Sequence, residues 1–141
     1  MNKQLIDEFC QLYQSLGKDN LDLLAQVYRQ DIAFIDPIHQ INGLDALTTY
    51  FNHLYQNMIS CQFNIEYVIV DDKQASIIWT MHYQHSKINA GKSISVNGSS
   101  FLKYDEKIYY HRDYFDVGQM LYEQLPLLSS VITMVKKRAV A

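Results

Sequence analysis

Three titratable side chains, Asp36, His111 and Asp113, are the residues of this sequence best suited to acid–base chemistry. His111 and Asp113 are two positions apart in a segment that alternates like a β-strand, so both side chains point to one face. A histidine beside a carboxylate can pass a proton near neutral pH. Asp36 ends the apolar run 32–35, and apolar surroundings disfavour the charged form of an aspartate, which makes it a better base. We therefore expect proton transfer, with Asp36 as base, Asp113 as acid and His111 orienting or relaying.

Each of these residues also has a purely structural interpretation. Asp36 precedes Pro37, so its carboxylate can cap a turn. Asp113 can pair with a neighbouring arginine, and His111 can donate to a buried backbone carbonyl. Asp116 is a second candidate for the acid if the strand contains a bulge. The residue types alone leave both interpretations open.

Aromatic side chains supply a candidate wall for a ligand pocket. The chain has eleven tyrosines, six phenylalanines and one tryptophan, and rings with a polar edge suit pocket linings and interfaces. Trp79, Met81 and Tyr83 alternate along one predicted strand and so share a face, although a plain hydrophobic core shows the same alternation. The predicted lining comprises Phe34, Asp36, Trp79, Met81, Tyr83, His111, Asp113 and Phe115.

Composition narrows the class of protein. The 141 residues suit a single globular domain, and a formal net charge of -3 without a long basic stripe argues against nucleic acid as the main partner. The first residues carry acids and lack the apolar core of a signal peptide, and no apolar run approaches the roughly 20 residues that span a bilayer. We expect a cytoplasmic protein in which Cys10 and Cys61 are buried thiols rather than a disulfide.

The sequence predicts neither a metal site nor a cofactor. His82 and His85 are three positions apart on a predicted strand and would face opposite sides. The metal-binding helix motif His-Glu-x-x-His, closely spaced cysteine pairs, phosphate-binding glycine loops and serine elbows are all lacking from the sequence.

Apolar periodicity predicts helices in the first part of the chain and strands in the second. Residues 3–16, 21–28 and 44–57 have helical spacing, and residues 32–36 form a short buried strand that Pro37 ends. Residues 41–43 predict a turn. Alternation then predicts four strands, joined by turns into antiparallel hairpins, at residues 62–70, 75–85, 94–104 and 107–116. This order predicts one α+β domain over residues 1–141, whose curved sheet and helices enclose a blind pocket.

The end of the chain, residues 117–141, predicts a helical extension in two pieces, 117–124 and 127–138, divided at Pro126. Its basic end, 136–138, favours the dipole of a helix C-terminus. The second piece has an apolar stripe that must be covered by the mouth of the domain, a second subunit or a membrane surface. We expect it to pack on the domain or on a partner subunit rather than on a membrane. The stripe comprises Leu127, Leu128, Val131, Ile132, Met134 and Val135.

Two groups of residues resemble a known family. Tyr28-Arg29-Gln30-Asp31-Ile32-Ala33-Phe34-Ile35-Asp36-Pro37, followed by residues 41–47 and Tyr50-Phe51, resembles the start of the nuclear transport factor 2-like superfamily. Residues 96–101 and 107–116 resemble its SnoaL-like branch, so that the resemblance covers almost all of residues 3–125. It implies a cone-shaped fold, a pocket for a small molecule and a homodimer formed through the convex face of the sheet.

The resemblance also suggests roles for individual residues. It aligns Asp36 with the general base of ketosteroid isomerases and Asp113 with the acid/base of SnoaL-like cyclases. Ser100 takes the place of the protonated aspartate of the isomerases, and Tyr13 is an approximate counterpart of their first-helix tyrosine, so both join the predicted lining. Because the isomerase oxyanion hole is not reproduced, steroid isomerisation is not predicted.

The combined prediction is a pocket protein that binds a small, largely apolar ligand. The chemistry expected of it is isomerisation, cyclisation or dehydration without a cofactor. The alternative is a non-catalytic dimeric binding or accessory domain whose cavity is filled by its own aromatic side chains.

Overall fold

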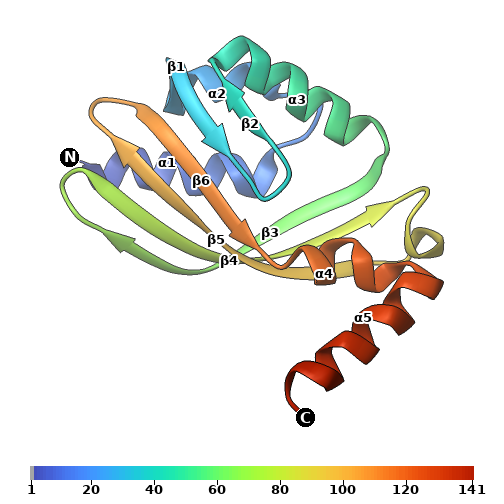
Figure 1. Ribbon diagram of the computed structural model, residues 1–141. Coiled ribbons are helices and arrows are strands. Elements are labelled where there is room, and N and C mark those ends of the chain that lie inside the picture. Colours follow the sequence, from blue (N-terminus) through green and yellow to red (C-terminus); the bar gives the residue numbers. More distant parts are fainter. Residues whose placement is uncertain (1) are drawn as a thin grey trace.

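The computed structural model describes residues 2–141 and shows helices packed inside one curved, unclosed sheet (Figure 1). The strand order is β2-β1-β6-β5-β4-β3. Side chains of α1, α3 and the inner side of the sheet share one hydrophobic core. The α+β cone predicted from the sequence is therefore confirmed, but the sheet is mixed rather than antiparallel.

The helices follow the predicted apolar periodicity closely. Helix α1 (Asn2–Ser15) and helix α3 (Leu44–Gln56) each bury one face against the sheet. Between them lie a 3-10 turn, η1 (Leu21–Leu23), and the one-turn helix α2 (Leu24–Val27). The second predicted helix ends before Tyr28, because Tyr28 is extended and begins the next strand.

Strands β1 (Tyr28–Ile35) and β2 (Gln40–Asn42) form a hairpin at one edge of the sheet. Residues 41–43 were predicted to be a turn, and this prediction is wrong. The turn lies earlier, between the two strands, and a three-residue strand is too short to show alternation. Gly43 ends β2 with φ +94°, a backbone conformation that favours glycine.

The four-stranded meander is confirmed. Strands β3 (Met58–Val70), β4 (Gln74–His85), β5 (Ile94–Tyr104) and β6 (Ile108–Phe115) pair antiparallel in sequence order. A short 3-10 turn, η2 (Asn89–Gly91), lies between β4 and β5. The additional feature is the parallel pairing of β1 with β6, which joins the beginning of the sheet to its end. No local pattern could indicate this pairing, because the two strands are far apart in the sequence.

Strand β6 contains an irregularity that sets which side chains face inward. The register with β5 shifts near Tyr104, so Ile108 and His111 are both fully buried although they are three positions apart. The shift precedes His111, and His111 and Asp113 keep their common face. Asp116 lies beyond the strand, where its carboxylate accepts a hydrogen bond from the Gln119 backbone N–H at 3.1 Å and caps helix α4 (Val117–Met120).

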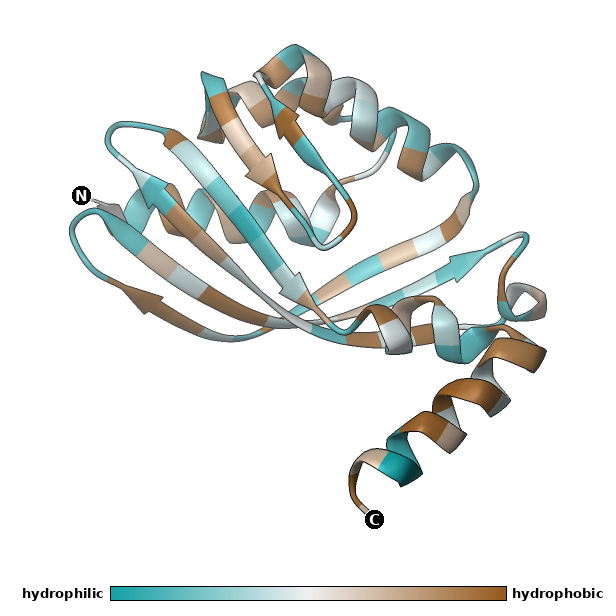
Figure 2. Cartoon of the chain, viewed as in Figure 1, coloured by the Kyte–Doolittle hydropathy of each residue, from teal (hydrophilic) through white to brown (hydrophobic). Residues whose placement is uncertain are grey.

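The C-terminal helix α5 (Pro126–Ala139) projects from the body of the domain (Figure 1). It follows α4 and the 3-10 turn η3 (Tyr122–Gln124), which is its main neighbour. Much of the helix is hydrophobic (Figure 2), and most of its apolar side chains are exposed, Leu127 at 87%. Among the residues that the structure describes, no helix is long and apolar enough to cross a membrane.

Candidate functional site

A cavity of about 150 Å³ lies between α1, α3 and the inner face of the sheet. Its wall is mainly aromatic and aliphatic, with two carboxyl groups, those of Asp36 and Asp113. Seven of the residues predicted to line a pocket do line it: Tyr13, Phe34, Asp36, Trp79, Met81, Asp113 and Phe115. Three do not, namely Tyr83, Ser100 and His111. The fold thus brings the two predicted carboxylates to one cavity and places His111 behind its wall.

His111 is fully buried and both of its ring nitrogens have partners. Nδ1 lies 2.6 Å from the Tyr28 hydroxyl, and Nε2 lies 2.6 Å from Asp113 Oδ1. The imidazole packs among aromatic rings, with its centroid 4.7 Å from that of Phe34 and 5.6 Å from that of Phe9. Neither nitrogen bonds to a backbone carbonyl, so the expected hydrogen bond from His111 to a carbonyl is wrong. His111 instead connects a tyrosine to the cavity carboxylate.

Asp113 is fixed through one of its two oxygens. Oδ1 accepts a hydrogen bond from the Ser100 hydroxyl at 2.5 Å, in addition to the contact with His111 Nε2. No hydrogen bond reaches Oδ2 from any residue that the structure describes, and the side chain is 17% exposed. Asp113 forms no ion pair with an arginine among the described residues. Oδ2 is therefore the oxygen available to a molecule in the cavity.

Ser100 acts from behind the cavity wall. It is 4% exposed and accepts a hydrogen bond from the Trp79 indole N–H at 2.9 Å while donating to Asp113. The indole reaches Ser100 by lying across Gly98, the residue that pairs with Trp79 on the neighbouring strand. Ser100 and Gly98 share the inner face of β5 because they are two positions apart. Ser100 thus orients both the carboxylate and the aromatic wall.

Tyr13 and Tyr28 extend the hydrogen-bonded group from His111 back to the cavity. Their hydroxyl oxygens are 2.6 Å apart, and Tyr28 is 1% exposed. Burial is the main reason that the pKa values of both phenols are raised well above the ordinary value, with the negative charge of Asp113 adding to the effect. Both hydroxyls therefore stay protonated and act as hydrogen-bond donors and acceptors.

Asp36 combines the two roles that the sequence left open. Oδ1 accepts hydrogen bonds from the backbone N–H groups of Ile38 and His39, at 2.8 and 2.7 Å, and so caps the turn after β1. Oδ2 accepts a hydrogen bond from the Tyr50 hydroxyl at 2.7 Å. The side chain is 6% exposed and lines the cavity. Burial and this carboxylate raise the pKa of Tyr50 far above its ordinary value.

Tyr83 lies outside the cavity, although it shares the inner face of β4 with Trp79 and Met81. It packs with Ile94 and Val96 in a second, smaller core, and its hydroxyl donates to the Met120 carbonyl. Met81, Phe115 and Met120 pack against this second core and themselves line the cavity, so Tyr83 lies behind them. Sharing a face was therefore not sufficient to place a residue in the pocket.

Several lining residues were not singled out from the sequence. Helix α3 contributes Tyr50, Phe51 and Tyr55, and strand β3 contributes Cys61 and Phe63. The α3 residues belong to the predicted apolar stripe of residues 44–57, which was the available signal. Burial raises the pKa of Cys61 to about 12, so this thiol is not a nucleophile at neutral pH.

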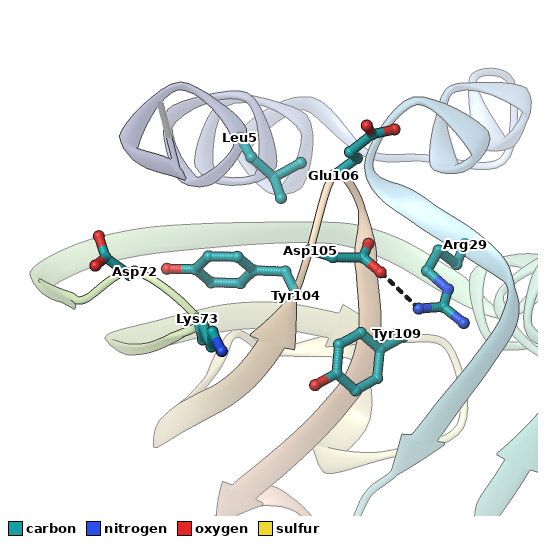
Figure 3. A pocket seen from close by; sticks show the side chains of 8 residues that line it. All are labelled: Leu5, Arg29, Asp72, Lys73, Tyr104, Asp105, Glu106 and Tyr109. Carbon is teal, nitrogen blue, oxygen red and sulfur yellow. Dashed lines mark hydrogen bonds and ion pairs between the residues drawn. The ribbon is translucent and has the colours of Figure 1, made fainter.

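A larger and shallower hollow, of about 780 Å³, lies beside Leu5 of α1 and the turns that follow β3 and β5 (Figure 3). Arg29 is held there by Asp31 and Asp105, at 2.6 and 2.7 Å, and the remaining walls carry charges of both signs. It contains none of the buried hydrogen-bonded residues described above. We therefore place the candidate site in the smaller, enclosed cavity. Within residues 2–141, no group of three or more His, Cys, Asp or Glu side chains could hold a metal ion.

Comparison with known proteins agrees with this architecture. The family model of the SnoaL-like domain matches residues 9–111. No curated protein matches the chain. A solved structure from Shewanella putrefaciens, named as a candidate SnoaL-like polyketide cyclase, is 19% identical, with 88% of this chain and 97% of that chain covered and a TM-score of 0.72.

Two further solved structures have the same fold. A nuclear transport factor 2-like protein of unknown function from Burkholderia pseudomallei is 13% identical, covers 84% of this chain and 93% of its own, and has a TM-score of 0.74. A protein with a ketosteroid isomerase-like fold from Catenulispora acidiphila, in complex with trimethylamine, is 12% identical, with 85% and 90% covered and a TM-score of 0.73. At these identities the likeness concerns the fold.

Proposed function

This chain belongs to the SnoaL-like domain family, and from that premise we propose that its cavity binds a small, largely apolar molecule and exchanges protons with it. The observation that carries the proposal is the asymmetry of Asp113. One oxygen is held by His111 and Ser100, the other is free of hydrogen bonds from the described residues, and the residue itself lines the cavity. A carboxyl group held in this way is positioned for a reacting molecule rather than for a structural ion pair.

The proposed reaction is a proton shift within the bound molecule. Asp36 Oδ2 removes a proton from carbon, and the electrons of the broken C–H bond move into the π system of the ligand. Asp113, in its acid form, returns a proton to another atom of the same molecule. The net change is an isomerisation, and cyclisation or dehydration follows if the shifted electrons close a ring or expel a hydroxyl group.

The size of the cavity limits the ligand. A cavity of about 150 Å³ with apolar walls can hold a molecule of the size of benzene, and pockets for larger ligands occupy roughly 300–1,000 Å³. The ligand is therefore no larger than one ring unless the mouth opens. Among the described residues no lysine or arginine lines the cavity, whereas two carboxyl groups do, so neutral or cationic molecules suit the wall better than anions. The trimethylamine complex of the Catenulispora protein supports the inclusion of small amines among the probes.

The test combines ligand discovery with three variants. Native mass spectrometry of the purified protein would identify a bound molecule, and thermal-shift screening with cyclic enones and small amines would supply probes. With a probe that is turned over, Asp113→Asn should lower the rate by about 100-fold or more, the usual contribution of a general acid. Asp116→Asn, a change outside the cavity, should leave the rate unchanged. If Asp36→Asn and Asp113→Asn bind and convert every probe like the wild type, the catalytic proposal is wrong.

The open cavity favours this proposal over the non-catalytic alternative. That alternative required a cavity filled by aromatic side chains of the domain, whereas Trp79 and Phe115 line a remaining space and Tyr83 belongs to the second core. Binding without turnover by both wild type and variants would restore the alternative.

We also propose a cytoplasmic homodimer. The free thiols of Cys10 and Cys61 agree with a reducing compartment. On the outer face of the sheet, Tyr67, Ile69 and Tyr114 are 67%, 66% and 51% exposed, and exposed apolar side chains of this kind are typical of an interface. Light scattering would give the mass in solution, and a monomer would contradict the dimer.

A further inference from the structure

Hydrogen bonds link four side chains in the order Tyr13–Tyr28–His111–Asp113. This hydrogen-bonded chain begins and ends at the cavity. Tyr13 and Asp113 line the cavity, whereas Tyr28 and His111 are 1% and 0% exposed. Three contacts of 2.6 Å join the four groups. The described residues offer Tyr28 and His111 no other side-chain hydrogen bond. A hydrogen gained or lost at one end of the hydrogen-bonded chain therefore changes the direction of the hydrogen bonds along it.

The number of polar hydrogens fixes the direction of these hydrogen bonds. When Asp113 is ionised and His111 is neutral, the four groups carry three such hydrogens, one each on Tyr13, Tyr28 and His111. Each hydrogen fills one of the three contacts, and all of them point toward Asp113. His111 then carries its proton on Nε2, and Tyr13 has only a lone pair left for the cavity.

A proton taken up by Asp113 adds a fourth hydrogen to three contacts. One arrangement leaves the chain unchanged and places the additional hydrogen on Asp113 Oδ2. Another reverses every contact, so that Asp113 Oδ1 donates to His111 Nε2, His111 Nδ1 donates to Tyr28, and Tyr28 donates to Tyr13. The hydrogen of Tyr13 then points into the cavity. Because the middle of the chain is sealed from solvent, only three arrangements leave no contact empty. The third differs from the reversed chain in one hydrogen, which stays on His111 Nε2, so that His111 is an imidazolium beside the Asp113 carboxylate and the hydrogen of Tyr13 again points into the cavity.

We propose that Tyr28 and His111 form a proton wire, through which the acidic proton of Asp113 can be offered to a bound molecule either by Asp113 or by Tyr13. The proposal rests on the proposed function, since it assumes a bound molecule that exchanges protons. It adds Tyr13 as a second donor and makes Tyr28 and His111 positioning residues that act through the two ends.

Delivery from Tyr13 balances without any outside group. The Tyr13 O–H bond breaks as its hydrogen passes to the bound molecule, and Tyr13 takes the hydrogen of Tyr28. Tyr28 takes the hydrogen from His111 Nδ1, and His111 Nε2 takes the hydrogen from Asp113. The chain is left in its first arrangement, with Asp113 as the carboxylate. Burial raises the pKa values of both phenols, so these transfers occur together rather than through a lasting phenolate.

Other ionisable groups near the chain come from three neighbouring elements. Asp36 follows β1, Cys61 lies on β3, and α3 contributes Tyr50 and Tyr55. Burial raises the pKa values of Tyr50, Tyr55 and Cys61, so all three remain neutral at moderate pH. Asp36 is the other group that can carry charge there, and His39 lies beside it at 3.8 Å. A titration of the chain must therefore be separated from a titration of Asp36.

Nuclear magnetic resonance of the protein without ligand tests the wire. Nitrogen-15 shifts give the protonation of each nitrogen of His111, and the carbon-13 shift of Tyr13 Cζ reports the hydrogen bonding of its hydroxyl. With Asp113 ionised and His111 neutral, we expect the proton of His111 on Nε2. As the pH falls, the fraction with the proton on Nδ1 should grow, and the Tyr13 signal should change with the same midpoint.

Two variants and one control separate the wire from a through-space effect. In Tyr28→Phe the link is cut, so the Tyr13 signal should lose its response to the titration. In Tyr13→Phe the hydroxyl that would accept the Tyr28 hydrogen in the reversed chain is missing. His111 should therefore keep its proton on Nε2 as the pH falls. This variant alone tests the wire if Tyr28→Phe does not fold. Tyr50→Phe removes a cavity hydroxyl that bonds to Asp36 and should preserve the shared titration.

Three results would overturn the wire. They are a His111 that gains no proton on Nδ1 as the pH falls, a Tyr13 signal that ignores the wild-type titration, and a Tyr13 response that survives in Tyr28→Phe. None of these measurements uses a substrate. A failed wire therefore leaves the proton exchange at Asp113 open to its own test, and an inactive protein leaves the wire testable.

Discussion

Asp36 and Asp113 are both carboxyl groups of the cavity wall, and their hydrogen bonds set them apart. Both oxygens of Asp36 are engaged, by the turn after β1 and by Tyr50. Asp113 keeps one oxygen without a hydrogen bond from the described residues. A bound molecule competes with fewer hydrogen-bond donors of the protein at Asp113 than at Asp36. The proposed chemistry therefore depends first on Asp113.

The buried tyrosines predict how stability depends on pH. Tyr13 and Tyr28 lose their protons in the unfolded chain near pH 10, whereas burial raises both pKa values in the folded state. Above that pH the unfolded state binds fewer protons than the folded state, so the free energy of unfolding falls as the pH rises. The slope approaches about 1.4 kcal/mol per pH unit for each such tyrosine.

Denaturant melts at increasing alkaline pH would measure this slope. Tyr13→Phe should flatten it, because one of the buried phenols is gone. Tyr122→Phe changes a side chain that is 44% exposed and should leave the slope as in the wild type. Equal slopes in the wild type and Tyr13→Phe would contradict the assignment.

The sequence could predict the pair His111 and Asp113 because two-residue spacing fixes a common face of a strand. It could not predict the partner of His111. Tyr28 has the spacing of a helix in the sequence, and it meets His111 across 83 positions, through a strand pairing without a local signature. The hydrogen bond that turns a candidate dyad into a longer chain was therefore beyond any local pattern.

Among the elements, the pair β4 and β5 shows how a strand can shape the site. Trp79 on β4 is opposite Gly98 on β5, and a Cβ atom at position 98 would overlap the indole ring. Glycine leaves the space that lets the ring lie across β5 and reach Ser100. The orientation of the aromatic wall thus depends on a missing side chain on the neighbouring strand.

Gly98→Ala should therefore displace the indole and destabilise the fold. Overpacking of a filled core costs about 1–3 kcal/mol, and the protein contains one tryptophan, so its fluorescence reports the displacement directly. Gly17→Ala is the matched control, because an added Cβ there meets no atom within 4 Å. An unchanged emission spectrum and an unchanged melt for Gly98→Ala would show that the ring does not occupy this space.

Some helix and strand boundaries follow from local sequence, and others depend on strands that are distant in the sequence. The long helices and the four-stranded meander follow from periodicity, which acts within a few residues. Residues 41 and 42 of the expected turn belong instead to β2, which exists because β1 supplies a partner for three residues. The register shift near Tyr104 likewise depends on two strands together.

At the scale of the whole molecule, α5 is the part least integrated with the rest. Its main neighbour is η3, and its ion pair between Lys136 and Glu123, at 2.7 Å, connects it to that same turn. None of its described residues lines the candidate cavity. The expected packing of the apolar stripe over the mouth of the domain is therefore not seen in the single chain.

Deletion of residues 126–141 should leave the domain folded. We expect the free energy of unfolding to change by no more than about 0.5 kcal/mol, as for changes at surfaces that bury little. Denaturant melts and light scattering of the full and shortened chains would test this. A large loss of stability together with a lower mass would show instead that a second copy covers the helix in solution.

The parallel pairing of β1 with β6 has a consequence for folding. Strand β1 precedes its partner by most of the domain, so during synthesis it must wait for nearly the whole chain before it can dock. Contacts of such long sequence separation form late and slow the folding of small domains. Tyr28 belongs to one of these strands and His111 to the other, so no partly made chain that lacks β6 can contain the hydrogen-bonded group. The hydrogen-bonded group can therefore form only once β1 has docked on β6, and a trapped intermediate with β1 undocked would retain most of its sheet and still lack this group.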